Sequence, residues 1–164
     1  MIVVYTGHGK GKTCACVGQA LRALGQGLRV FFGQFIKREN CSGEQKLLAF
    51  LLKERFFCSG LGFVQRGDIS YSLHRKAASV MLKWTESVLA EADLLVLDES
   101  IYALNYALIS VDELQNLLLS ARCTSTHLVL SGREAPEWLL EEADLVSTIL
   151  PTKHPKQHHI GIEF

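Results

Sequence analysis

The sequence of 164 residues lacks a surplus of either charge, because seventeen Lys and Arg balance seventeen Asp and Glu. Proteins that hold nucleic acid by counterion release normally carry a basic surplus, so this balance disfavours a nucleic-acid partner. No apolar run approaches the roughly 20 residues that a membrane-spanning helix needs, and no leader sequence precedes the first expected strand. We therefore expect a cytoplasmic protein that binds neither nucleic acid nor a membrane.

The sequence also lacks the motifs of several site types. Its cysteines are odd in number and form no Cys-x-x-Cys pair, which is typical of reduced thiols. Nothing in it indicates a Ser/His/Asp hydrolase, a zinc site or a Gly-x-Gly-x-x-Gly dinucleotide site. His154 and His158 have the spacing of a metal-binding helical pair, but Pro155 interrupts that helix, so a solvated tail is expected instead.

No linker or low-complexity tract divides the chain, and 48% of its residues are hydrophobic, so we expect one domain over residues 1–164. Residues 151–164 are expected to form an irregular C-terminal tail. Apolar runs alternate with helical patterns before that point, which predicts an α/β fold with a mostly parallel sheet of about six strands. The expected strands are 2–6, 28–32, 56–57, 94–97, 127–130 and 145–150, and the expected helices are 14–24, 44–53, 72–92, 111–121 and 136–143.

A glycine-rich turn, Gly7-His8-Gly9-Lys10-Gly11-Lys12-Thr13, directly follows the first expected strand. Glycines allow close approach of the backbone to an anion, and the loop N–H groups and the next helix N-terminus carry partial positive charge. We predict a phosphate-binding loop in which Lys12 neutralises the terminal phosphates and Thr13 contacts Mg²⁺. The pattern Gly-x-x-x-x-Gly-Lys-Thr is incomplete, because Thr6 stands at the position of its first glycine. A plain strand-to-helix turn is the competing interpretation.

Two acidic residues, Asp98 and Glu99, follow the apolar run 94–97. A carboxylate at the end of a buried strand beside a phosphate loop is placed to hold Mg²⁺, so we predict that Asp98 binds the metal directly or through water. Glu99 has three candidate roles: a second metal contact, a base that polarises water, or a residue that orients the acceptor. The competing interpretation is a strand end that simply turns into solvent.

Arg133 follows Ser131-Gly132 at the end of another apolar strand, where its guanidinium could reach a polyphosphate from the side opposite Lys12. A surface arginine that caps a helix fits the same spacing. Lys10, Arg22 and Lys37 are further cations, of which only Lys10 is close to the loop in sequence. These residues indicate an enzyme that uses a magnesium nucleotide, without naming its reaction.

Across nearly its whole length the sequence resembles the P-loop type of ATP:corrinoid adenosyltransferase. The segments that carry the resemblance are residues 6–13, Gln34-Phe35-Ile36-Lys37, Gly62-Phe63, Val96-Leu97-Asp98-Glu99, Tyr106-Ala107-Leu108, residues 131–136, Ala143-Asp144-Leu145-Val146, Lys153-His154-Pro155 and Gly161-Ile162-Glu163-Phe164. The resemblance implies a three-layer P-loop NTPase (RecA-like) fold. It also implies transfer of the 5′-deoxyadenosyl group of ATP to the Co(I) centre of a reduced corrinoid, with release of triphosphate.

The resemblance further implies roles for individual residues and partners. Lys12, Glu99 and Arg133 would act on the nucleotide, Arg22 matches a position near it, and Phe63 would displace the lower axial ligand of the corrinoid. Mg²⁺ would accompany ATP, a flavoprotein or other reductant would supply electrons, and the protein would be a homodimer. The displaced glycines fit the family's unusual ATP orientation, with the γ-phosphate in the loop.

The sequence departs from the family pattern after Phe63, where Val64-Gln65-Arg66 replaces the usual Thr-Trp-Glu and leaves Gln65 in place of an aromatic residue. The tail is shorter than expected, and no extension precedes the first strand. Two other functions therefore stay open. One is a conventional P-loop kinase or NTPase that releases ADP, and the other is a family member that binds ATP or corrinoid with weak or no turnover.

Overall fold

Strands and helices alternate along the chain in the computed structural model, which describes residues 1–64, 67–153 and 159–162. The strands are β1 (Ile2–Thr6), β2 (Val30–Gln34), β3 (Phe56–Cys58), β4 (Leu94–Asp98), β5 (His127–Ser131) and β6 (Leu145–Thr148). The helices are α1 (Lys12–Gly25), α2 (Gly43–Leu52), α3 (Tyr71–Val88), α4 (Ser100–Asn105), α5 (Val111–Cys123) and α6 (Glu137–Glu142), with a 3₁₀ turn at Lys53–Arg55. None of these helices, in the part of the chain described, is long and apolar enough to cross a membrane.

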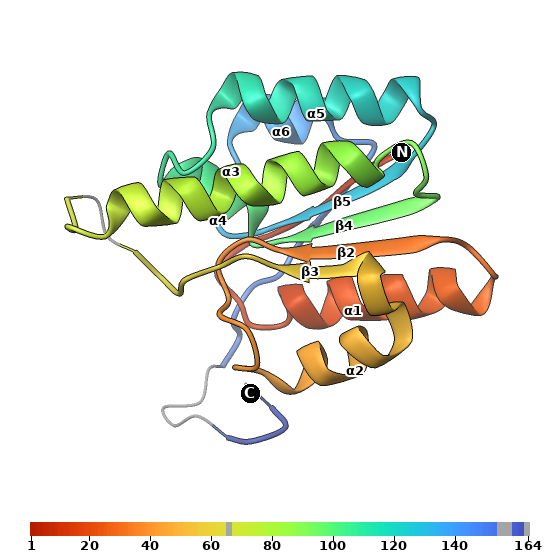
Figure 1. Ribbon diagram of the computed structural model, residues 1–164, viewed down its shortest axis with the longest axis horizontal. Helices are drawn as coiled ribbons and strands as arrows, with labels where there is room; N and C mark the ends of the chain where they lie inside the picture. Colours follow the sequence, from red (N-terminus) through yellow and green to blue (C-terminus); the bar gives the residue numbers. More distant parts are fainter. Residues whose placement is uncertain (65–66, 154–158, 163–164) are drawn as a thin grey trace.

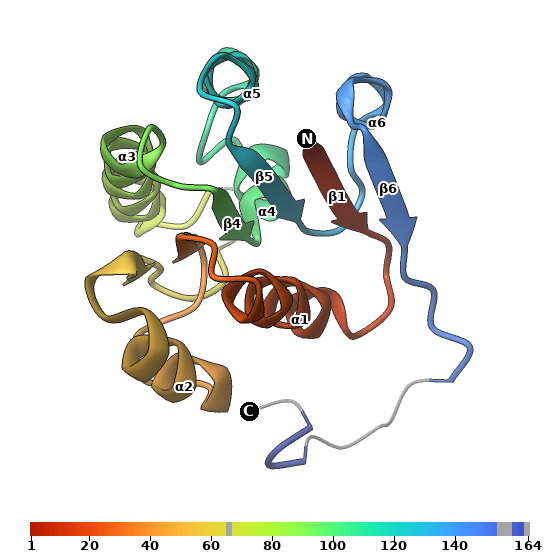
Figure 2. The same ribbon diagram turned by 90° about the vertical axis from the view of Figure 1, so that its right-hand side faces the viewer.

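The six strands form one sheet in the order β3-β2-β4-β5-β1-β6, and every neighbouring pair is parallel. Helices α1 and α2 cover one face, and α3, α4, α5 and α6 lie on the other (Figures 1 and 2). The fold class predicted from the sequence is therefore confirmed. A purely parallel sheet needs crossover connections that cover both faces, which explains why its central strands are apolar on both sides.

Side-chain alternation along each strand divides the core into two layers. Ile2 and Val4 of β1 pack in the layer that contains α3, α4 and α5, whereas Val3 packs in the layer that contains α1 and α2. In β4, Leu95 and Val96 divide in the same way. Both layers consist of closely packed, buried apolar side chains, so the sheet is a rigid platform for the loops at its carboxyl ends.

Several bounds differ from the expected elements. Strand β2 spans Val30–Gln34 and not 28–32, because Leu28 and Arg29 are exposed after the turn that follows α1, and β6 ends at Thr148 and not at 150. Helix α3 ends at Val88, because residues 89–91 form a turn in which the Ala92 N–H still bonds to the Val88 carbonyl. The sequence prediction also missed α4, a helix of six residues that starts directly after β4. A capping box starts α5: Ser110 Oγ accepts from the Glu113 N–H, and the Glu113 carboxylate accepts from the Ser110 N–H.

The sheet order places four predicted strand ends next to one another. After β1 the chain crosses over β5 and β4 to reach β2, and ligands of open α/β sheets bind where strand connections diverge in this way. Thr6, Gln34, Asp98 and Ser131 end β1, β2, β4 and β5 at this edge. All four are buried, so polar groups converge beneath the loops.

Gly33 supplies a test of the packing between β2 and α3. A Cβ there would lie 2.8 Å from Met81 Sδ and 3.0 Å from Trp84 Cζ3. We predict that Gly33→Ala lowers the free energy of unfolding in urea by about 1–3 kcal/mol, because the core is already full. Gly18→Ala is the matched control: its Cβ would point into open space within α1, so it should raise stability by about 0.5–1 kcal/mol. Equal effects of the two substitutions would contradict this packing.

Candidate functional site

The glycine-rich loop joins β1 to α1 and is folded around its own lysine. Lys12 Nζ donates hydrogen bonds to the carbonyl oxygens of Gly7 and Gly9, both at 2.8 Å. Burial lowers the pKa of Lys12, because the charged ammonium loses its solvation there, and an anionic partner would offset this loss. Gly7 and Gly11 have φ values of 100° and 119°, a region that favours glycine. The loop is therefore shaped for an anion that would replace the carbonyl oxygens as the partner of Lys12.

The structure gives a physical reason for the displaced glycines. A Cβ on Gly7 would lie 2.4 Å from the carbonyl oxygen of Ile149, and one on Gly9 would lie 2.8 Å from the same atom. The Gly9 N–H donates to that oxygen at 2.8 Å. Backbone from the segment after β6 thus lies against the loop at both positions, and only glycine leaves it room.

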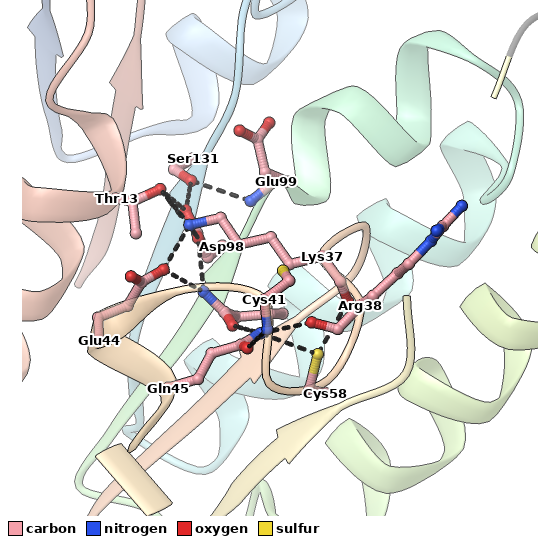
Figure 3. Close-up of polar contacts among 11 residues, drawn as sticks. Thr13, Lys37, Arg38, Cys41, Glu44, Gln45, Cys58, Asp98, Glu99 and Ser131 are labelled. Carbon is pink, nitrogen blue, oxygen red and sulfur yellow. Dashed lines mark hydrogen bonds and ion pairs between the residues drawn. The ribbon is translucent and has the colours of Figure 1, made fainter. Parts of the chain in front are cut away.

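Asp98 is the centre of the polar groups beneath the loop and has no exposed surface. Its carboxylate accepts hydrogen bonds from Thr13 Oγ1 at 3.1 Å, Gln34 Nε2 at 3.1 Å and Ser131 Oγ at 2.7 Å (Figure 3). Lys37 Nζ lies 3.7 Å away and supplies a positive charge. The predicted pair Thr13 and Asp98 therefore comes together from α1 and β4.

The oxygens of Thr13 and Asp98 fit a magnesium site that also uses nucleotide phosphates. Magnesium is commonly held by one or two carboxylates, substrate phosphates and water, and not by an all-protein cage. Consistent with that, residues 1–64, 67–153 and 159–162 contain no group of three or more His, Cys, Asp or Glu placed to hold a metal ion. Direct metal binding by this pair stays a prediction.

Sequence reasoning missed most of a second polar group, which lies between β2 and α2. Lys37 forms an ion pair with Glu44, and Gln45 Nε2 donates to Gln34 Oε1 at 2.8 Å (Figure 3). Burial alone would lower the pKa of Lys37, but the carboxylates of Asp98 and Glu44 outweigh it and raise that pKa above its usual value. The segment Gln34–Lys37 belongs to the family resemblance, whereas nothing in the sequence pairs it with the first turn of α2.

Glu99 has a left-handed backbone conformation and a raised pKa. Its φ is 59°, in the left-handed region, and its N–H donates to Ser131 Oγ at 3.0 Å. Burial and the nearby charge of Asp98 raise the pKa of Glu99 to about 7. The side chain lines the same cleft as Lys12 and Arg133, so it can hold or release a proton there.

A cleft of about 1370 Å³ opens above these groups. Of the residues predicted from the sequence, those that line it are His8, Gly9, Lys10, Gly11, Lys12, Thr13, Lys37, Phe63, Glu99 and Arg133. Gly7 and Asp98 lie beneath this lining.

Arg22 does not reach the cleft: it is exposed in the last turn of α1, about 15 Å along the helix from Lys12 at 1.5 Å per residue. Gly161 and Ile162 of the tail also line it.

One wall of the cleft is aromatic. Phe63 is 74% exposed, and its ring meets the ring of Tyr102 edge-on at 5.2 Å. Tyr102 in turn stacks on Tyr106 at 4.2 Å. The Tyr102 hydroxyl donates to the Val64 carbonyl at 2.9 Å and accepts from the Val64 N–H at 3.3 Å, which fixes the backbone next to Phe63. Gln65, where the family pattern has an aromatic residue, lies outside the described residues, as do His154 and His158.

Comparison with known proteins gives a consistent result over the whole chain. The family model described as ATP:corrinoid adenosyltransferase BtuR/CobO/CobP matches residues 1–164. The corrinoid adenosyltransferase of Sinorhizobium sp. is 34% identical over 171 residues, which cover 100% of this chain and 80% of the relative. The corrinoid adenosyltransferase CobA of Salmonella typhimurium is 35% identical over 158 residues, which cover 94% of this chain and 78% of the relative.

Similarity to solved structures concerns the fold alone. The genome packaging NTPase B204 from Sulfolobus turreted icosahedral virus 2, solved with ATP-gammaS, aligns with a TM-score of 0.54 at 16% identity. The alignment covers 94% of this chain and 76% of that protein. The architecture is therefore that of P-loop NTPases, as the loop and the strand order indicate.

The raised pKa of Glu99 predicts a pH dependence of stability in the protein without nucleotide. The folded state binds this proton more tightly than the unfolded chain, so the free energy of unfolding should fall as pH rises from 4.5 to about 7 and then level off. The fall contributed by Glu99 is at most about 3 kcal/mol. Urea denaturation across this range measures it, and Glu99→Gln should remove it. An unchanged pH profile in this variant would contradict the assignment.

Tyr102→Phe tests whether the hydroxyl fixes the segment that carries Phe63. The variant keeps the ring contact but loses both hydrogen bonds to Val64. We predict about tenfold faster amide hydrogen exchange at residues 61–64, the effect of about 1.4 kcal/mol of lost local stability. Tyr5→Phe, which loses a 3.5 Å bond to Gln19, is the control and should leave this segment unchanged. The same exchange rate in Tyr102→Phe and wild type would show that the hydroxyl is not needed.

Proposed function

This chain belongs to the ATP:corrinoid adenosyltransferase family, and from that membership we infer that it transfers the 5′-deoxyadenosyl group of ATP to the Co(I) centre of a reduced corrinoid. The Co(I) electron pair attacks C5′ and forms the cobalt–carbon bond, the bond from C5′ to oxygen breaks, and triphosphate leaves with the electron pair of that broken bond. The observation that carries this conclusion is the match over the whole chain, at 34–35% identity to named enzymes. A conventional kinase or NTPase reaction is not favoured.

We propose that the phosphate loop acts on the triphosphate as it leaves. Co(I) is already a strong nucleophile, so the protein's task is to align C5′ with cobalt and to stabilise the growing negative charge. Lys12 would exchange its two carbonyl partners for phosphate oxygens, and Arg133 lines the cleft as a second cation. Mg²⁺ held by Thr13 and Asp98 would neutralise further phosphate charge. Glu99, which lines the same cleft as Lys12 and Arg133, would adjust the net charge of the site through its proton.

We propose that the corrinoid binds at the aromatic wall formed by Phe63, Tyr102 and Tyr106. Phe63 is exposed yet held by an aromatic contact and by the anchored backbone of Val64, as a side chain that displaces an axial ligand would need to be. Because the wall and the phosphate loop line one cleft, the two substrates can meet within it. Tyr102 and Tyr106 extend the apolar surface beyond Phe63 itself.

Three further proposals come from the family resemblance. The protein would act as a homodimer, would receive electrons through a flavoprotein or other reductant that forms Co(I), and would work in the cytoplasm. Its five free cysteines fit a reducing compartment. Each of these stays a prediction.

The decisive experiment mixes the protein with Mg-ATP and chemically reduced cobalamin and identifies both products. We predict one triphosphate for each alkylated corrinoid, and Lys12→Ala should lower kcat/KM by roughly a hundredfold or more, because it removes a charge that contacts the leaving group. Lys46→Ala is the control, since Lys46 is exposed on α2 away from the cleft lining.

The other outcomes have clear meanings. Release of ADP without alkylation would refute the proposed reaction and favour a kinase or NTPase. Tight ATP and corrinoid binding without product would favour a family member that binds its ligands without turnover. Full activity in Lys12→Ala would refute the assignment of the loop.

A further inference from the structure

The ammonium of Lys37 lies among the oxygens assigned to the metal. Its Nζ is 3.3 Å from Thr13 Oγ1 and 3.7 Å from Asp98 Oδ2, and it also forms an ion pair with Glu44. Figure 3 shows this nitrogen at the point where the side chains from β4, α1 and α2 converge. A cation therefore already occupies the neighbourhood of the predicted metal site.

The charges around Lys37 explain why a cation is needed there. Asp98 is fully buried, and Glu99 and Glu44 add two more carboxyl groups near it. A buried carboxylate without a counter-ion is strongly unfavourable. Lys12 is occupied by the carbonyl oxygens of the loop, and among the residues that the structure describes Lys37 forms the ion pair with Asp98.

The backbone around Lys37 is fixed, whereas its ammonium contacts Thr13 and Asp98 on one hand and Glu44 of α2 on the other. The Lys37 carbonyl accepts from Cys58 Sγ at 2.9 Å, and Gln45 holds the loop that follows through bonds to the Arg38 carbonyl and the Cys41 N–H. Glu44 projects from the first turn of α2 toward the Lys37 ammonium (Figure 3). A small movement of the side chain can thus release Asp98 and keep the Glu44 ion pair.

We propose that Lys37 is a built-in counter-ion that takes the place of the metal while the nucleotide is absent, and that Glu44 retains it when the metal binds. This inference rests on the proposed function, because it takes Thr13 and Asp98 as the metal ligands. Metal alone must compete with Lys37 and binds weakly, whereas metal that arrives with ATP brings phosphate charge that offsets the displacement. The ion pair of Lys37 and Glu44 thus makes metal binding dependent on the nucleotide.

The test measures metal affinity directly, by the loss of free Mn²⁺ signal in electron paramagnetic resonance. Without nucleotide, Lys37→Met should bind Mn²⁺ at least tenfold more tightly than wild type, because the competing cation is gone. Lys46→Met removes the same charge from the exposed face of α2 and should stay within twofold of wild type. Unchanged or weaker binding in Lys37→Met would overturn the proposal. If Lys37→Met fails to fold, Lys37→Gln takes its place as the test variant, because it keeps a hydrogen-bond donor for Glu44.

A double-variant cycle tests the part assigned to Glu44. With ATP present, Glu44→Gln should weaken Mn²⁺ binding about tenfold in the wild-type background, since Lys37 then stays on Asp98. In the Lys37→Met background the same substitution should change the affinity less than twofold. Equal effects in both backgrounds would show that Glu44 acts on the metal independently of Lys37, which would overturn its retaining role.

The same titrations separate this proposal from the function on which it rests. If wild type with ATP binds no Mn²⁺, or if Asp98→Asn binds it as well as wild type, the metal assignment itself fails. If wild type binds Mn²⁺ with ATP and loses it in Asp98→Asn, but Lys37→Met behaves as wild type, only the counter-ion proposal fails.

Discussion

The buried carboxylate of Asp98 is the constraint on which the rest of this site depends. It lies at the end of the central strand β4, has no contact with solvent, and must therefore be satisfied entirely by protein groups. A hydroxyl from α1, an amide from β2 and a hydroxyl from β5 meet this need. The same hydrogen bonds hold three neighbouring strands and the first helix in register at the carboxyl edge of the sheet.

The phosphate side and the aromatic side of the cleft position their groups in different ways. On the phosphate side, cations and backbone N–H groups are assembled from rigid elements, so little reorganisation is needed when charge develops. On the aromatic side, Phe63 is exposed and depends on the ring and hydroxyl of Tyr102 for its position. The aromatic side therefore relies on a few local contacts, and it is also where the sequence departs from the family pattern.

Much of this arrangement could be predicted from local sequence. The β1 strand, the glycine loop and Lys12 are contiguous, and an apolar run that ends in Asp98 indicates both a buried strand and its carboxylate. Lys37 with Glu44, and Tyr102 with Val64, could not be predicted, because each pair joins separate elements through side-chain geometry. Arg22 shows the converse: its match to a family position does not bring it to the cleft of this chain, because α1 carries it away from the loop.

The contact between the loop and Ile149 limits how this protein can change in evolution. Gly7 and Gly9 are required by backbone from a different part of the chain, so a substitution at either position needs a compensating shift of the segment after β6. That segment carries no side-chain requirement here, since the atoms involved are its carbonyl and amide groups. A side chain can therefore be accommodated at Gly7 or Gly9 only if the backbone after β6 moves away, so the two segments must change together at these positions.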